Sequence, residues 1–189
     1  MLRMTDVMVD TETTGLNPQT SAIIQLSAIK FNFKERAIGQ MFDRAPAMLP
    51  MRSWHEGTRE FWMVKNRATY DELIIRQEEA RPVFLDFFNW IGKDEPEGGY
   101  RFWAKPTSFD WPIVASHMEQ LGLPMPMHYR IARDMNSFIA GLRGEPDHYS
   151  FEEEVPFNGT PHNALHDCAW QLDVLFHAAD RFLSTEVMS

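Results

Sequence analysis

Residues 9–16, VDTETTGL, decide how the rest of this sequence is interpreted. They follow the short apolar run of residues 6–9, DVMV, which is typical of a buried strand. Asp10 and Glu12 stand two residues apart, so on an extended chain both carboxylates point to the same side. Gly15 then allows a tight turn and a close approach of the backbone to a ligand. The stretch therefore brings two negative charges to one point of the fold.

The composition indicates a globular protein of one domain, residues 1–189, with 44% hydrophobic and 24% charged residues. No apolar run approaches the roughly 20 residues that span a bilayer. The single cysteine, Cys168, excludes an internal disulfide and suits a reducing cytoplasm, where we expect the protein. The formal charge of −9 argues against a broad basic surface for nucleic acid. Either the partner is no polyanion, or the contact is small and bridged by bound cations.

The order of the expected elements favours an α/β layer fold with a mixed sheet. Strands are expected first, and later strands alternate with helices that flank the sheet. The expected strands cover residues 6–9, 21–33, 37–44, 100–104 and 129–133, the first three forming an antiparallel meander. The expected helices cover residues 58–65, 69–91 with a division near Pro82, 109–121, a short stretch ending at 142, and 162–183.

Clustered carboxylates cost free energy through repulsion and desolvation, so protons or cations must neutralise them. Protonation would give a carboxylate pair suited to acid–base chemistry. Hard divalent cations such as Mg²⁺ or Mn²⁺, which prefer oxygen ligands, are the other solution. The simplest alternative is a polar turn in which Asp10, Glu12 and the neighbouring threonines are merely solvated.

Two further regions carry acids that could join this cluster. Residues 105–114, KPTSFDWPIV, place Asp110 at an expected helix start, where the helix dipole alone would also favour an acid. Residues 161–172, PHNALHDCAWQL, place His162 and Asp167 five residues apart. A zinc site built from His162, His166 and Cys168 is disfavoured, because the acid-rich pattern suits oxygen-ligated ions.

Taken together, these motifs resemble those of the DEDDh exonucleases in the DnaQ-like, ribonuclease-H-fold superfamily. The resemblance rests on Asp-Thr-Glu-Thr-Thr-Gly at 10–15, Ser108-Phe109-Asp110 and His162-x-x-x-x-Asp167, and it spans nearly the whole chain. It implies a ribonuclease-H-like, five-stranded mixed sheet in which the meander is followed by parallel strands. Within the superfamily the chain is most similar to the phage group that includes exonuclease A of T-even phages. The short matching segments are Met41-Phe42-Asp43, Glu60-Phe61-Trp62 and residues 164–169. If the protein is phage-encoded, it would act in the host cytoplasm.

The resemblance also implies a set of catalytic and metal-binding residues. Asp10, Glu12 and Asp167 would hold one divalent cation, and Asp10 with Asp110 would hold a second. His162 would be the general base, a role for which imidazole is suited near neutral pH. The two ions, Mg²⁺ or Mn²⁺, would support attack of water on the last phosphodiester, releasing a nucleoside 5′-monophosphate.

An exonuclease must hold a 3′ end without reading its sequence, and stacking on apolar side chains does this. Leu16, Phe61, Trp62 and Phe109 are the candidates for such contacts. Core packing is the alternative for the three aromatic side chains and is favoured for Phe109. The hydroxyls of the threonines and the ammonium of one lysine could contact sugar or phosphate; these residues are Thr11, Thr13, Thr14 and Lys105.

The leading hypothesis is a metal-dependent 3′–5′ exonuclease that acts on single-stranded DNA. The phage-group resemblance favours DNA, but a 3′–5′ exoribonuclease or oligoribonuclease acting on RNA is the close alternative. A non-catalytic nucleic-acid-binding protein on the same fold is less favoured, because all five motif positions are filled. No membrane contact is expected, and the sequence leaves the oligomeric state open.

Overall fold

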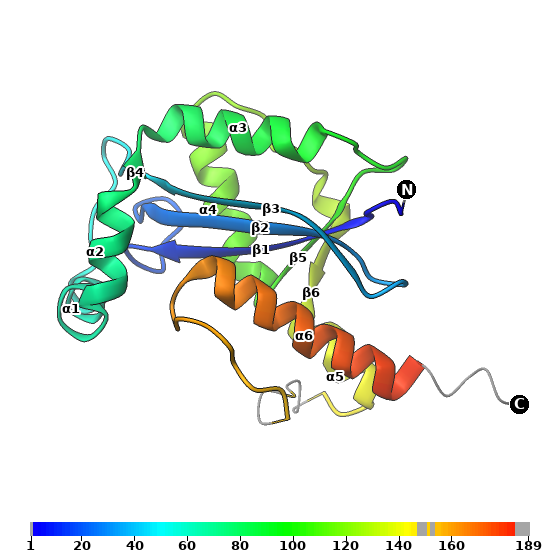
Figure 1. Cartoon of the computed structure of the whole chain (residues 1–189). Coiled ribbons are helices and arrows are strands. Elements are labelled where there is room, and N and C mark those ends of the chain that lie inside the picture. The colour runs from blue at the N-terminus through cyan, green and yellow to red at the C-terminus, as the bar shows by residue number, and fades with distance from the viewer. Residues whose placement is uncertain (1, 147–150, 152–153, 184–189) are drawn as a thin grey trace, which may run out of the picture.

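A computed structural model describes residues 2–146, 151 and 154–183, which form a mixed six-stranded sheet flanked by helices (Figure 1). Strands β1 (Asp6–Thr13), β2 (Ile23–Asn32) and β3 (Ala37–Pro46) form the antiparallel meander. Strand β5 (Arg101–Ala104) pairs in parallel with β1, and β6 (Ala132–Asp134) in parallel with β5. The predicted fold class is therefore confirmed. The sixth strand, β4 (Gln77–Glu78), is a two-residue addition beside β3 at the sheet edge.

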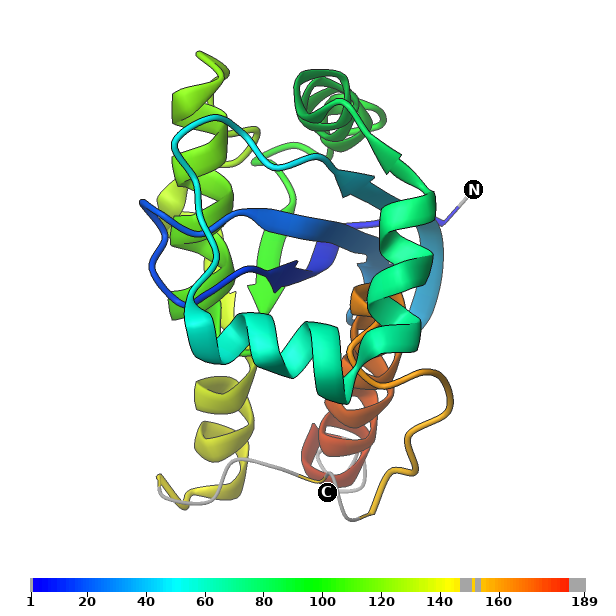
Figure 2. The same ribbon diagram turned by 90° about the vertical axis from the view of Figure 1, so that its left-hand side faces the viewer.

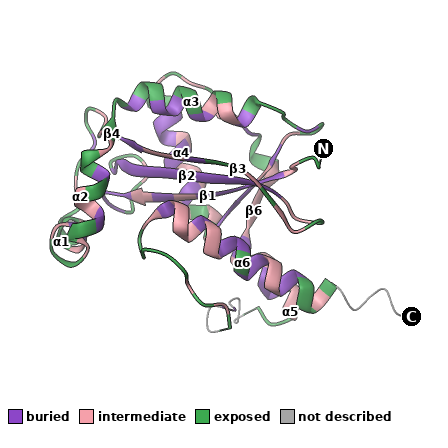
Figure 3. Cartoon of the chain, in the orientation of Figure 1, coloured by how far each residue is buried: buried purple, intermediate pink, exposed green. Residues whose placement is uncertain are grey.

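Alternation along β1 sends its side chains to two separate cores. Val7 and Val9 pack with α3 (Ala80–Gly92) and α4 (Thr107–Gln120) on one face of the sheet. Met8 packs with α5 (Met135–Arg143) and α6 (Ala164–Leu183) on the other face. Helices α3 and α6 lie on opposite sides of the sheet in both views (Figures 1 and 2), and the central strands between them are buried (Figure 3).

The helical region before the second half of the sheet differs from the expectation. Helix α1 (Glu56–Glu60) continues into a π-helical turn, η1 (Phe61–Lys65), instead of forming one helix over residues 58–65. The expected helix over 69–91 is two helices, α2 (Arg67–Ile75) and α3, separated by β4. The break therefore precedes Pro82, which lies in the first turn of α3, where its missing N–H costs nothing.

Two other boundaries shift where tertiary contacts decide them. Residues 129–133 are a 3₁₀ turn, η2 (Tyr129–Ile131), followed by β6, and not one strand. Helix α6 begins at Ala164 instead of residue 162, because the Asn163 side chain caps it. The Asn163 Oδ1 accepts the backbone N–H groups of Leu165 at 3.2 Å and His166 at 3.4 Å.

The fold brings the end of β1 together with the starts of α4 and α6, since both helices pack on β1 from opposite faces. Strand β1 extends through Thr13, so Asp10 and Glu12 lie inside a paired strand and not after it. Within the described residues, no helix combines the length and apolarity needed to cross a membrane.

Candidate active site

Three carboxylates meet at the end of β1 on the face covered by α6. Asp10 and Glu12 project from β1 at the spacing of two that the sequence predicted, and Asp167 lies in the first turn of α6. One oxygen from each of the three lies within 4.8 Å of the others. Three hard oxygen donors this close together match the ligands that Mg²⁺ and Mn²⁺ prefer, so these residues fit a divalent cation.

The fourth acid, Asp110, reaches the same cleft from the opposite face of the sheet. It lies in the first turn of α4 and is 2% exposed. The Thr11 hydroxyl donates to its Oδ1 at 2.7 Å, which fixes one carboxylate oxygen. Asp110 lines a cleft of about 280 Å³ together with Asp10, Glu12 and Asp167. The structure thus places all four predicted acids around one cleft, although Asp110 stands outside the close group of three.

Burial and mutual repulsion make these acids hard to ionise. Burial, followed by the charge of Asp167, raises the pKa of Asp10 to about 7. The pKa values of Glu12 and Asp110 rise well above their usual range, again mainly through burial and then through the charge of Asp10. Burial also raises the pKa of Asp167, against the opposing charge of His162. The cluster therefore demands neutralisation, by protons or by cations.

The protein's own compensation for this charge is slight. The Gln171 Nε2 donates to Asp10 Oδ1 at 2.7 Å, and this contact lowers the pKa of Asp10. The Lys105 ammonium is near enough for the charges of Asp10 and Asp167 to raise its pKa, although its own burial lowers that pKa more. In the part of the chain that the structure describes, no arginine forms an ion pair with these acids.

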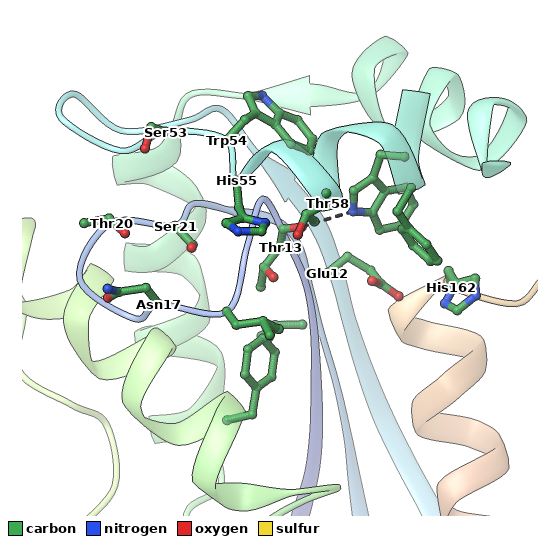
Figure 4. Close-up of a pocket in the computed structure, with 16 residues that line it drawn as sticks. Glu12, Thr13, Asn17, Thr20, Ser21, Ser53, Trp54, His55, Thr58 and His162 are labelled. Carbon is green, nitrogen blue, oxygen red and sulfur yellow. Dashed lines mark hydrogen bonds between the residues drawn. The ribbon is translucent and has the colours of Figure 1, made fainter. Parts of the chain in front are cut away.

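His162 stands at the rim of the cleft, on the segment just before α6. It is exposed and has a left-handed backbone, with φ of 59°. Its ring centroid lies 4.8 Å from that of Phe61, edge to face. The Glu12 carboxylate is directed toward His162 (Figure 4). An imidazole in this position can exchange a proton with a molecule bound between the acids and the aromatic wall.

A second cavity, of about 750 Å³, continues from Glu12 and His162 along the loop after β1. Its volume lies in the range of small-ligand pockets. Polar side chains on its far wall, which sequence reasoning missed, include Asn17, Ser21, His55 and Thr58 (Figure 4). No motif marks them, because the fold alone brings the loop after β1 and the start of α1 to the same cavity.

Gly15 makes that wall possible. A Cβ at this position would lie 2.7 Å from the Ser21 Oγ and 2.9 Å from the His55 Cβ. The loop after β1 can therefore meet the segment around His55 only with glycine here. Among the hydrogen bonds that join the segments, the His55 N–H donates to Thr14 O at 2.9 Å and the Trp62 Nε1 donates to Thr13 O at 3.0 Å.

Of the residues predicted to contact the substrate, all but Thr14 line one of the two cavities. Most of them line the larger cavity, the smaller cleft or both: Thr11, Thr13, Leu16, Phe61, Trp62, Phe109 and Lys105. Leu16 is 80% exposed, as a side chain that stacks on a base must be, whereas Trp62 is 1% exposed and mainly fills the core. Thr14 is fully buried, and its hydroxyl donates to Ser53 O and accepts from Ala22 N. Thr14 thus holds two loops together, and its predicted substrate contact has no support in this geometry.

The comparison with protein families agrees with this site. Residues 5–178 match the model of the Rv2179c-like 3′–5′ exoribonuclease domain, and the chain belongs to that family. The description of this family names a 3′–5′ exoribonuclease activity. No curated protein sequence matches the chain.

Solved structures share the fold at low sequence identity. A zinc-bound complex of E. coli exonuclease I with single-stranded DNA has a TM-score of 0.73 at 14% identity, covering 95% of this chain and 41% of that one. A complex of E. coli exonuclease I with a dA16 oligonucleotide has a TM-score of 0.71 at 15% identity, covering 96% and 42%. Cell-death related nuclease 4 has a TM-score of 0.62 at 17% identity, covering 95% and 64%. This chain thus spans about two fifths of the length of exonuclease I.

Proposed function

We propose that this protein removes nucleoside 5′-monophosphates from the 3′ end of single-stranded nucleic acid by metal-dependent hydrolysis. The observation that carries the proposal is the close group formed by Asp10, Glu12 and Asp167 in a cleft that opens into the larger cavity. Exonuclease I is much longer than this chain, which covers 41% of it. We therefore propose the activity for residues 1–189 alone, as a single exonuclease domain.

The acids would hold two divalent cations, Mg²⁺ or Mn²⁺. Asp10, Glu12 and Asp167 would hold one, and Asp10 with Asp110 the other. When bound, such ions polarise a phosphoryl oxygen and make water easier to deprotonate. The raised pKa of Asp10 supports this assignment, since a bound cation offsets the burial and the repulsion by Asp167 that favour its protonated form.

The remaining residues would bind the strand and move one proton. An imidazole nitrogen of His162 would take the proton of the attacking water and pass it to solvent, where its exposed ring can release it. Leu16 would stack on the terminal base, with Phe61 and Phe109 forming the wall of the cavity. Lys105, which lines the cleft, would contact the phosphate.

DNA is the first candidate substrate and RNA the second. The resemblance to the phage exonuclease A group favours DNA, and it remains a prediction about specificity. The description of the family as exoribonucleases is the observation that favours RNA. Discrimination depends on a contact to the 2′-hydroxyl, and the polar side chains of Asn17 and Ser21 on the cavity wall are candidates for it.

The test uses 5′-labelled DNA and RNA strands of equal sequence, incubated with Mg²⁺ or Mn²⁺ and, in parallel, with a chelator. We expect products that shorten one nucleotide at a time from the 3′ end, with the metal only. The strand that is degraded at the higher rate identifies the preferred substrate. If folded protein supplied with metal cleaves neither strand, the proposal is contradicted. The result would then favour a non-catalytic nucleic-acid-binding protein on the same fold.

A further inference from the structure

Gln25 is a buried polar side chain that lines neither cavity. It lies on β2 directly opposite Glu12 of β1 and is 0% exposed. Residues directly opposite on antiparallel strands project from the same face, so Gln25 faces α6, as Glu12 does. A fully buried amide needs partners for both its donor and its acceptor.

Within the described residues, the side chain of Gln25 forms hydrogen bonds with two parts of the fold, the start of α6 and strand β3. Its Oε1 accepts the backbone N–H of Ala164, the first residue of α6, at 3.0 Å. Its Nε2 donates to Asn163 Oδ1 at 3.3 Å and to Asp43 Oδ1 at 2.8 Å. One amide thus connects the start of α6 with strand β3.

Asp43 is a firm anchor for this amide. Its Oδ1 also accepts from the Ser27 hydroxyl at 2.7 Å, and its carboxylate pairs with Arg76 at the end of α2. These contacts keep the pKa of Asp43 below its usual value in spite of its burial. The carboxylate is therefore charged, and a charged acceptor makes a stronger hydrogen bond to Gln25.

Gln25 forms hydrogen bonds with residues 163 and 164, which lie between two residues of the candidate site. His162 immediately precedes Asn163, and its backbone φ of 59° lies in the left-handed region that few non-glycine residues adopt. Asn163 caps α6 with its side chain, and its carbonyl accepts the N–H of Asp167 at 2.9 Å. Fixing residues 163 and 164 thus fixes His162 on one side and Asp167 on the other.

We propose that Gln25 is a positioning residue that clamps the start of α6 to β3 and so holds His162 and Asp167 against β1. The inference rests on the proposed function for the roles of those two residues. An amide suits this position because it carries an acceptor oxygen and an NH₂ group with two donors on separate atoms, and Gln25 uses both groups. Methionine has similar length and neither group, and asparagine keeps the amide but is one methylene shorter.

The test compares Gln25→Met and Gln25→Asn with Ser27→Ala. The serine variant is the matched control, because it also removes one hydrogen bond to Asp43 but keeps the Gln25 amide and its contacts with residues 163 and 164. Thermal unfolding first confirms that each variant is folded. If the methionine variant does not fold, the asparagine variant carries the test, since it buries no new apolar volume.

The first readout is independent of activity. In metal-free protein, the side-chain NMR signal of His162, assigned with His162→Gln, should shift and broaden in both Gln25 variants. The signal of His117 should not move, because its buried ring contacts the Ile113 carbonyl and accepts the Ile23 N–H on the face of the sheet opposite α6. Neither signal should change in Ser27→Ala. An unaltered His162 signal in both folded Gln25 variants would overturn the clamp even if the protein proved inactive.

The second readout is steady-state kinetics on the better strand. We expect kcat to fall about 10- to 100-fold in the Gln25 variants, the range measured for residues that orient ligating groups. KM should stay within about threefold, because Gln25 does not line the substrate cavity. An equal loss in Ser27→Ala would show a general effect of the Asp43 network and contradict the specific role. An inactive wild type would refute the proposed function and leave the NMR result to decide the clamp.

Discussion

Both ends of β1 carry acids, a buried Asp6 at the start and the half-buried Asp10 and Glu12 at the end, but the two ends compensate the charge differently. At the start of the strand, Asp6 is 0% exposed and its carboxylate receives the Arg101 guanidinium through two contacts of 2.5 Å. The Trp103 Nε1 at 2.7 Å and the Thr5 hydroxyl at 2.7 Å complete its surroundings.

At the other end of the same strand, Asp10 receives one amide hydrogen bond and Glu12 none that the structure records among the described residues. Lysine and histidine stand near by, yet the pKa values of Asp10 and Glu12 remain raised. An arginine of the same chain offsets the charge of a buried carboxylate, and removing one partner of such a pair leaves an uncompensated charge. A group of carboxylates without an arginine is a cost to the fold that a bound cation can offset.

The largest expected effect separates the two ends by activity. Asp10→Asn keeps the shape of the side chain and removes a charge proposed to bind both cations. We expect the exonuclease rate to fall at least about 1,000-fold, the scale of the several kcal/mol that metal ions contribute. Asp6→Asn, measured as rate per folded molecule, should stay within about threefold of wild type. Equal losses in both variants would remove the distinction between the ends.

The next effect distinguishes proton transfer from metal binding at the site itself. His162→Ala should lower kcat about 100- to 10,000-fold, the usual contribution of a positioned general base. Its apparent affinity for Mn²⁺ should change little, because no ligand is lost. Metal titrations of the rate test this, and activity within a few-fold of wild type would show that another group takes the proton.

The third effect concerns stability, for which substitution at the start of β1 should cost more than substitution at its end. Asp6→Asn leaves the Arg101 charge poorly compensated and should cost about 2 to 3 kcal/mol of unfolding free energy, reduced from the fully buried case because Arg101 is partly exposed. Asp10→Asn should not destabilise metal-free protein, because it relieves repulsion. Denaturant unfolding in chelator measures both. A larger loss in Asp10→Asn would contradict the comparison.

The smallest effect is the pH dependence of stability in metal-free protein. Burial raises the folded-state pKa of Asp10 from 3.8 to about 7, so folded protein holds this proton more tightly than unfolded protein does. The stability that this proton contributes is complete below about pH 4 and is lost as the pH rises toward 7. Relative to Asp10→Asn, wild type should lose about 1 to 3 kcal/mol between pH 5 and pH 8. A difference that does not change with pH would exclude the raised pKa.

Sequence reasoning found the acids because their spacing is local: a period of two on β1 and the first turns of two helices. It could not find Gln25 or Gln171. Gln25 contacts Asp43 18 positions away and residues 163 and 164, which are 138 and 139 positions away, and Gln171 contacts Asp10 161 positions away. These contacts depend on how β1, β2, β3 and α6 pack together. The same limit explains Thr14, which belongs to the first motif by sequence but is turned into the loop contact with Ser53. Strand β4 escaped prediction because two residues carry no periodicity.

The most direct test is a calorimetric titration of metal-free protein with Mn²⁺ in the presence of a nucleoside 5′-monophosphate. The account predicts that wild type and Asp6→Asn take up two ions per chain and that Asp10→Asn fails to bind both. Undiminished uptake by Asp10→Asn, or no uptake by wild type, would show that something other than divalent cations neutralises the acidic end of β1.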